Sequence, residues 1–167
     1  MAYLILVFNQ HVLDQINPQT LLQDLKAVHF STLCHQYGLD PALIEPALAH
    51  LGVEMAETGP VPYFFVRYRP RQQPPLVVHR WDAGEFWQHQ GLGAEGLTAL
   101  PPVVREQLAH TQTVYAVALE KDQLTDLGLL LAYELARWLA HRGTGIVYGL
   151  DSAWYRLNAH QAFIPVE

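Results

Sequence analysis

The chain contains one cysteine, Cys34, which is followed directly by His35. A nucleophilic thiol needs a base within hydrogen-bonding distance. Adjacent residues of a helix point about 100° apart around its axis, so His35 is badly oriented to serve Cys34. The better interpretation is a buried thiol that packs as a small apolar side chain. With a single cysteine, no intramolecular disulfide is possible, and we predict no catalytic residue here.

Nine histidines raise the question of a metal site. None of them forms the H-x-H, H-x-x-x-H or H-x-x-E-H spacings that are typical of zinc ligands. The sequence therefore predicts no metal and no other cofactor. A zinc site assembled from histidines far apart in the chain stays open as an alternative.

The segment Gly91–Gly96 matches the G-x-G-x-x-G pattern of dinucleotide-binding loops. That pattern binds pyrophosphate only where it follows a strand and opens a helix. Here a Gln-His-Gln segment precedes it, and Pro101-Pro102 follows too soon for a crossover helix. We interpret the segment as a loop without a phosphate site.

The most unusual local composition is Trp81-Asp-Ala-Gly-Glu-Phe-Trp87, in which large aromatics alternate with acids. Trp81 and Trp87 either pack under a long loop or form part of a recognition surface. Aromatic side chains anchor protein interfaces, whereas acids such as Asp82 and Glu85 steer a basic partner. Trp81, Asp82, Glu85 and Trp87 are therefore the predicted partner-binding residues.

The clearest structural unit lies near the end of the chain. It consists of a strand at Thr113–Glu120, a helix over about Gln123–Arg142 and a strand at Gly145–Leu150. Asp122 or Thr125 is the expected N-cap of the helix, with Gly143 at its end. The helix is apolar nearly all round, which predicts that it is mostly buried. A right-handed crossover is expected if its two strands are parallel neighbours.

The rest of the chain predicts an α+β fold of one domain, residues 1–167, with a mixed or antiparallel sheet. Helices are expected mainly on one face, in a ferredoxin-like or related arrangement. The predicted elements are a strand at Ala2–Phe8, helices at Gln19–Tyr37, Ala42–His50 and Val103–Ala109, and a hairpin of Val61–Tyr68 with Leu76–Trp81. We expect Gly38 and Gly52 to end the first two helices and Asp40 to cap the second. The segment Asp82–Gly96 is expected to be irregular apart from one helical turn around Glu85–His89.

The composition limits the class of partner. The formal net charge is −6, and only 16% of residues are charged while 50% are hydrophobic. Nucleic acid is bound by Lys and Arg that replace counterions, so we expect no nucleic-acid partner. The apolar segment Leu127–Ala140 is too short to span a bilayer, and no leader-like segment opens the sequence, so the expected location is the cytoplasm.

A resemblance to a known class enters at Ala132–Asn158, AYELARWLAHRGTGIVYGLDSAWYRLN. An apolar helix with small residues every four positions ends at Gly143, a Gly145–Tyr148 strand follows, and Trp154-Tyr155 comes after a short turn. This unit resembles the C-terminal part of small bacterial α+β domains, including immunity proteins against contact-delivered toxins. The resemblance implies an acidic, cytoplasmic, toxin-binding protein without an activity of its own.

The leading hypothesis is accordingly a non-enzymatic binding protein that neutralises a cognate toxin, a basic domain, by covering its active site. One alternative is a small enzyme or small-molecule-binding domain with a pocket between sheet and helices, lined by Tyr, Trp and His. Another is a structural homo-oligomer, a homodimer for example, in which the apolar helix packs against a second copy.

Overall fold

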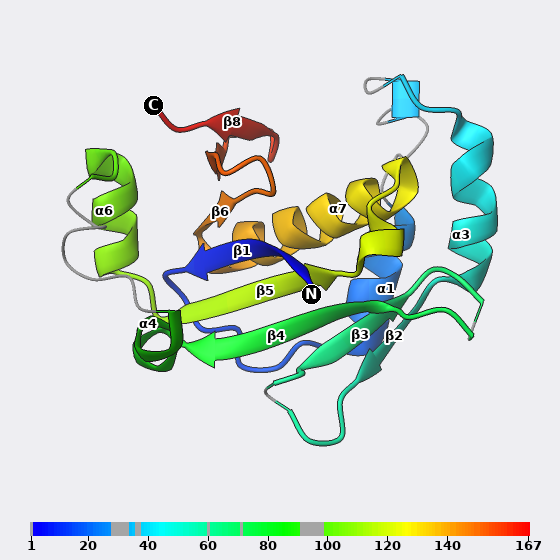
Figure 1. The fold of residues 1–167 in the computed structure, drawn as a ribbon, viewed down its shortest axis with the longest axis horizontal. Helices are drawn as coiled ribbons and strands as arrows, with labels where there is room; N and C mark the ends of the chain where they lie inside the picture. Colours follow the sequence, from blue (N-terminus) through cyan, green and yellow to red (C-terminus); the bar gives the residue numbers. More distant parts are fainter. Residues whose placement is uncertain (1, 28–33, 36–37, 60, 71, 91–98) are drawn as a thin grey trace.

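A computed structural model describes residues 2–27, 34–35, 38–59, 61–70, 72–90 and 99–167 (Figure 1). Within these ranges, eight strands form one antiparallel sheet in the order β2-β3-β4-β5-β1-β6-β7-β8. They are β1 (Tyr3–Asn9), β2 (Gly52–Met55), β3 (Phe64–Arg67), β4 (Leu76–Asp82), β5 (Thr113–Leu119), β6 (Gly145–Tyr148), β7 (Trp154–Leu157) and β8 (Phe163–Pro165). The predicted α+β class is confirmed, and of the two expected sheet types the antiparallel one is found.

The centre of the sheet is β1, which lies between β5 and β6 and pairs antiparallel with both. Its apolar run suits this central position, and Ile5, Val7 and Phe8 are almost completely buried. Because β5 and β6 each run opposite to β1, they are parallel to each other. They are not neighbours, however, so the connection between them crosses over β1.

That connection is the helix α7 (Asp126–Gly143), which covers one face of the sheet. Ten of its residues are buried, as the apolar pattern predicted. Thr125 caps its start, accepting a hydrogen bond from the Gly128 N–H at 3.1 Å. The predicted helix began slightly earlier, at Gln123. Instead Lys121–Gln123 form a separate 3₁₀ turn, closed by a capping box between Glu120 and Gln123.

Helix α1 (Pro18–Ala27) lies beside α7 on the same face. Asp24 joins the two, because its carboxylate accepts hydrogen bonds from the Trp138 indole at 2.9 Å and from Arg142 at 2.8 Å. These bonds, from Trp138 first and Arg142 second, hold the pKa of Asp24 below its usual value. Much of the predicted helix Gln19–Tyr37 beyond Ala27 lies outside the described residues.

The following segment confirms several local predictions. Cys34 is fully buried, and burial raises the pKa of its thiol. Gly38 has a φ of +70°, the left-handed conformation expected of it. The Asp40 carboxylate caps a 3₁₀ turn, Pro41–Leu43, which runs into α3 (Ile44–His50).

Two short helices, α4 (Ala83–Gln90) and α6 (Pro102–Ala109), lie on the second face of the sheet. The segment of α4 was expected to be irregular apart from one helical turn around Glu85–His89; the helix is found there, but it is longer and begins at Ala83. The helix forms because Asp82 Oδ1 accepts a hydrogen bond from the Gly84 N–H at 3.0 Å and Phe86 is buried beneath it. The G-x-G-x-x-G segment, 91–96, lies outside the described residues.

The end of α7 returns to the sheet through a close contact with Asn9. This buried side chain donates a hydrogen bond from Nδ2 to the Leu139 carbonyl at 3.1 Å. A Cβ atom on Gly143 or on Gly145 would collide with the Asn9 amide. Between them Thr144, not the predicted Gly143, takes the left-handed cap position, with φ +53°. The two glycines are thus required by close approach to β1.

Candidate functional site

Aromatic side chains from four strands and α4 meet on the second face of the sheet. Phe8, only 1% exposed, is at their centre. Its ring centroid lies 5.6 Å from that of Phe86, 5.9 Å from that of Trp87, which is stacked on it, and 5.4 Å from that of Trp154. Such aromatic pairs contribute about 0.5–1.5 kcal/mol each beyond their buried area, so this arrangement is firmly packed.

The group extends in two directions. The ring centroid of Tyr148 on β6 lies 4.8 Å from that of Trp154, and the ring centroid of Trp81 on β4 lies 5.9 Å from that of Phe86. His79 stacks on Trp81 at 5.5 Å. We call the whole set the aromatic cluster; its members are Phe8, His79, Trp81, Phe86, Trp87, Tyr148 and Trp154. Its centre is buried, whereas its outer members are each partly exposed.

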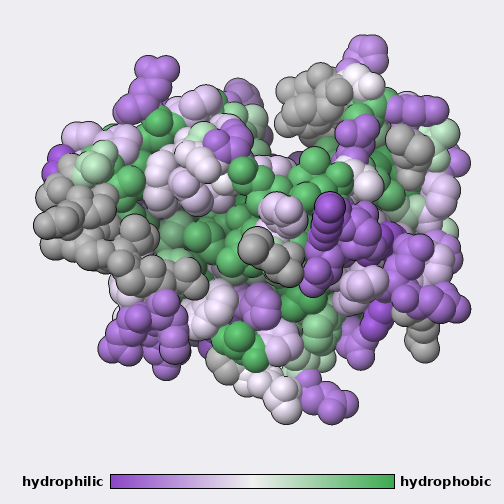
Figure 2. Space-filling view, in the orientation of Figure 1, coloured by the Kyte–Doolittle hydropathy of each residue, from purple (hydrophilic) through white to green (hydrophobic). Residues whose placement is uncertain are grey.

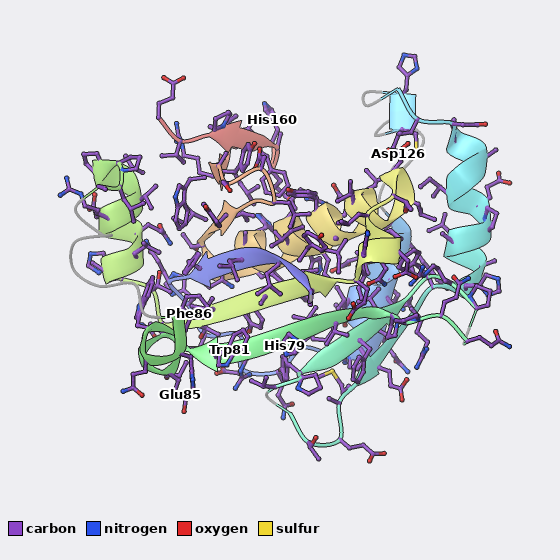
Figure 3. The ribbon with its side chains drawn as sticks, viewed as in Figure 1. His79, Trp81, Glu85, Phe86, Asp126 and His160 are labelled. Atoms are coloured by element: carbon purple, nitrogen blue, oxygen red, sulfur yellow. The ribbon has the colours of Figure 1, made fainter. Side chains whose placement is uncertain are left out.

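The four predicted partner-binding residues fall around this cluster. Trp81 and Trp87 both contact Phe86, so the fold brings them together through a third aromatic. Asp82 caps α4 and remains exposed, and Glu85 is exposed on the first turn of the same helix. Figure 3 shows Phe86 turned from α4 toward the sheet and Glu85 on the outer side of that helix.

Five members of the cluster were not predicted as site residues, namely Phe8, His79, Phe86, Tyr148 and Trp154. His79 and Phe86 lie close to Trp81 in the chain, on β4 and α4. The other three come from strands far apart in the chain, which the pairing of β6 with β1 and β7 brings together. A signal was present in the aromatic pair Trp154-Tyr155. Residues alternate between the two faces of a sheet, so Trp154 joins the cluster while Tyr155 packs toward α7.

Hydrophobic surface gathers over this face of the molecule. Figure 1 shows α1 and α7 behind the sheet and α4 in front of it, and Figure 2, from the same side, shows hydrophobic residues concentrated over the middle strands. Leu4 and Leu6 of β1 are only partly buried there. An apolar surface bordered by polar residues is typical of an interaction site.

His79 is the titratable member of the cluster. Burial lowers the pKa of its imidazole, and Nδ1 is buried without a hydrogen-bond partner among the described residues. The neutral form of His79 is therefore favoured in the folded chain. Protonation of His79 places a charge at a partly buried position against the Trp81 ring.

A dependence of stability on pH is expected from His79. Its pKa is lower in the folded chain than in the unfolded chain, near 6.5, so the unfolded chain binds more protons on acidification. We expect His79→Phe, which keeps an aromatic ring against Trp81, to lose less stability than the wild type between about pH 7 and pH 5. Denaturant unfolding at several pH values measures this. The exposed His160 is the control, since His160→Gln should keep the wild-type slope; an unchanged slope in His79→Phe would contradict the prediction.

A second candidate site lies on the opposite face, next to the segment that precedes α1. It is a hollow of about 900 Å³ against β2, β4 and the residue before β3. Its lining residues are Asp14, Gln15, Ile16, Asn17, Pro18, Gln19, Val53, Met55, Tyr63 and Arg80. Its volume is in the range of small-molecule sites, although half of its lining residues are polar or charged. Of the Tyr, Trp and His lining considered from the sequence, it contains only Tyr63.

Arg80 gives this hollow a positive charge. Its guanidinium lies 4.8 Å from the ring centre of Tyr63. Directly opposite it on β5 is Tyr115, which is completely buried. Burial raises the pKa of Tyr115 to about 12, with the charge of Arg80 acting in the opposite direction. No hydrogen bond of normal geometry reaches the Tyr115 hydroxyl from the described residues.

Three further observations concern metal ligands, membrane spans and similarity to known proteins. Among the described residues, no three His, Cys, Asp or Glu side chains gather in a way that would hold a metal ion. In the same part of the chain, no helix has the length and apolar character to cross a membrane. Comparisons of the chain with family models, with curated proteins and with solved structures found no match.

Proposed function

We propose that this chain is a non-enzymatic binding protein that neutralises a bacterial toxin, a basic protein domain, by covering its active site. The observation that carries the proposal is the aromatic cluster, whose partly exposed members Trp81 and Trp87 lie next to the carboxylates of Asp82 and Glu85. The resemblance of Ala132–Asn158 to immunity proteins supports the same function.

The buried centre of the aromatic cluster is rigid, and its outer members keep exposed surface that a partner can contact. Trp87 is held by stacking on Phe8, so little conformational entropy is lost when its exposed part meets a partner. Partly buried aromatics of this kind are the usual anchors of protein interfaces. The apolar surface of Leu4 and Leu6 extends the area available for contact.

Charge favours a basic partner. The net charge of −6 attracts a cationic domain over a distance, and the exposed Asp82 and Glu85 direct it toward the α4 end of the cluster. Arg156 is exposed on β7 and has its side chain on the same face. It therefore disfavours basic groups there, and we place the partner's positive surface over α4.

The alternative of a homo-oligomer held by the apolar helix loses its physical reason, because α7 packs inside the chain between the sheet and α1. A homodimer would have to form through another surface, such as the aromatic cluster. The other alternative, a pocket between sheet and helices, has a specific observation in its favour, namely the hollow that contains Arg80.

The test begins with the protein domain encoded beside the gene for this chain. We expect that domain to inhibit growth when expressed alone, to be harmless when expressed with this chain, and to form an equimolar complex in titration calorimetry. Asp82→Asn combined with Glu85→Gln should slow association at low salt, with a smaller effect at high salt. Asn at position 82 still caps α4, so the fold is preserved.

A matched control removes the same charge elsewhere. Asp126→Asn with Glu45→Gln neutralises two exposed acids on α7 and α3, and it should leave the association rate nearer to the wild type. If both double variants slow association equally, the partner responds to net charge alone and the placement over α4 is wrong. If the neighbouring domain is harmless or does not bind, the toxin-neutralising function is wrong.

A further inference from the structure

The hollow beside Arg80 lies on the face of the sheet opposite to the aromatic cluster, so a ligand bound there would not contact the proposed partner. One wall is apolar, formed by Ile16, Val53 and Met55, and Tyr63 stands next to Arg80. A cation at one end of an apolar wall suits a ligand that has one charged group and an apolar body.

Arg80 differs from the other arginines that are not fully exposed. Four arginines have a carboxylate partner within 4.0 Å; the pairs are Arg67–Glu54, Arg69–Asp122, Arg137–Glu134 and Arg142–Asp24. Arg80 is half-buried, and no carboxylate among the described residues pairs with it. A guanidinium cannot lose its charge in a protein, and its planar donors match a carboxylate. A half-buried guanidinium has lost part of its hydration, so a hydrogen-bond acceptor beside it is stabilising.

Tyr115 of β5 is the buried neighbour of Arg80. Its hydroxyl has no exposed surface and no hydrogen bond of normal geometry from the described residues, although a buried polar group without a hydrogen bond is costly. Its ring centroid lies 6.3 Å from that of Tyr63, and it faces Arg80 across β4 and β5. Tyr115 does not line the hollow; it lies beside Arg80, which acts on its hydroxyl by charge and as a hydrogen-bond partner, so the hydroxyl is placed to orient the guanidinium.

We propose that this hollow binds a small monocarboxylic acid with an apolar body. The carboxylate accepts hydrogen bonds from the Arg80 guanidinium, which Tyr115 helps to position, and the apolar body packs on Ile16, Val53 and Met55. Asp14 is the acidic residue of the lining and is exposed. Its negative charge disfavours di-anions such as phosphate, which is why we assign a single carboxylate.

The experiment compares 3-phenylpropionate with 3-phenylpropanamide, which has the same shape without the charge. Ligand-observed NMR and titration calorimetry on the full chain measure both. We expect saturable binding of the acid with a Kd below about 10 mM, as is usual for a ligand of this size. The amide should bind about tenfold more weakly, because a charged hydrogen bond is replaced by a neutral one.

Variants locate the site. Arg80→Met keeps the length of the side chain without its charge, and Tyr115→Phe removes only the hydroxyl that helps to position Arg80. Arg80→Met should weaken binding of the acid more than binding of the amide, and Tyr115→Phe should have a smaller effect in the same direction. Arg67→Met, on β3 and paired with Glu54, is the matched control and should bind the acid like the wild type. A thermal melt of each variant without ligand shows that it folds, and Tyr115→Phe, which leaves no cavity and no unpaired group, should melt at or above the wild-type temperature.

Three results would overturn the proposal. The first is no saturable binding of the acid, and the second is equal binding of acid and amide. The third is wild-type affinity for the acid in Tyr115→Phe and in Arg80→Met, or in Tyr115→Phe alone if Arg80→Met does not fold. Tighter binding of inorganic phosphate than of 3-phenylpropionate would replace the carboxylate by a general anion and would equally contradict it. None of these results bears on binding at the aromatic cluster.

Discussion

Leu135→Asp is expected to abolish the cooperative unfolding transition of this chain at room temperature. Leu135 is completely buried in α7, between that helix and the sheet. An unpaired carboxylate at such a position costs several kcal/mol, in addition to the lost packing of the leucine. The total stability of a domain is about 5–15 kcal/mol, so little or none remains. Circular dichroism with a denaturant titration measures the outcome, and Leu131→Asp should act in the same way.

The control for this prediction is Val103→Asp. Val103 is 52% exposed at the start of α6, where a negative charge is favourable to the helix. The same kind of substitution there should change the free energy of unfolding by no more than about 0.5 kcal/mol. A Leu135→Asp protein that melts like the wild type would mean that α7 does not belong to the core.

Gly145→Ala is the second substitution with a large expected effect, although it adds only one methyl group. The new Cβ would collide with Asn9 Oδ1 and would lie 3.0 Å from the Phe8 carbonyl oxygen. Asn9 cannot turn away freely, since its Nδ2 donates to the Leu139 carbonyl at the end of α7. We expect a loss of about 2–3 kcal/mol in the free energy of unfolding, as for other overpacked sites.

A double-mutant cycle shows whether Asn9 is the cause. Asn9→Ala removes the colliding amide, so Gly145→Ala should cost clearly less in that background than in the wild type. Gly52→Ala in β2 is the control, because nothing lies within 4 Å of the position of its Cβ, and it should be neutral or slightly stabilising. Equal costs of Gly145→Ala in both backgrounds would show that the collision is not with Asn9.

The parts of the fold that the sequence predicted are its long regular segments. The run Ala2–Phe8, the hairpin of β3 with β4, and the unit of β5, α7 and β6 have patterns long enough to identify helix or strand. The strands β2, β7 and β8 were missed, since each has only three or four residues and is stabilised by its neighbours in the sheet rather than by its own pattern. Helix α4 was predicted only as one turn around Glu85–His89, because two glycines and three aromatics nearby suggested a loop.

The candidate sites depend on strand register, which a single sequence does not contain. Trp81 and Trp87 are close in the chain, so their grouping was visible; Phe8 and Trp154 reach them only through the order β4-β5-β1-β6-β7. The hollow was missed for the same reason. Arg80 and Tyr115 look like ordinary strand residues until β4 and β5 are paired, and only then do a buried hydroxyl and a cation face each other.

The position of β1 between β5 and β6 also has a consequence during synthesis on the ribosome. Residues 10–112 must be translated before the partner strand β5 begins, which takes about 5–20 s at ordinary elongation rates. Throughout that time the segment YLILVFN has no strand to pair with, and it is a strongly apolar one. Nascent chains are therefore at risk of aggregation until α7 and β6 emerge, and this protein should depend on a chaperone that binds short extended apolar segments.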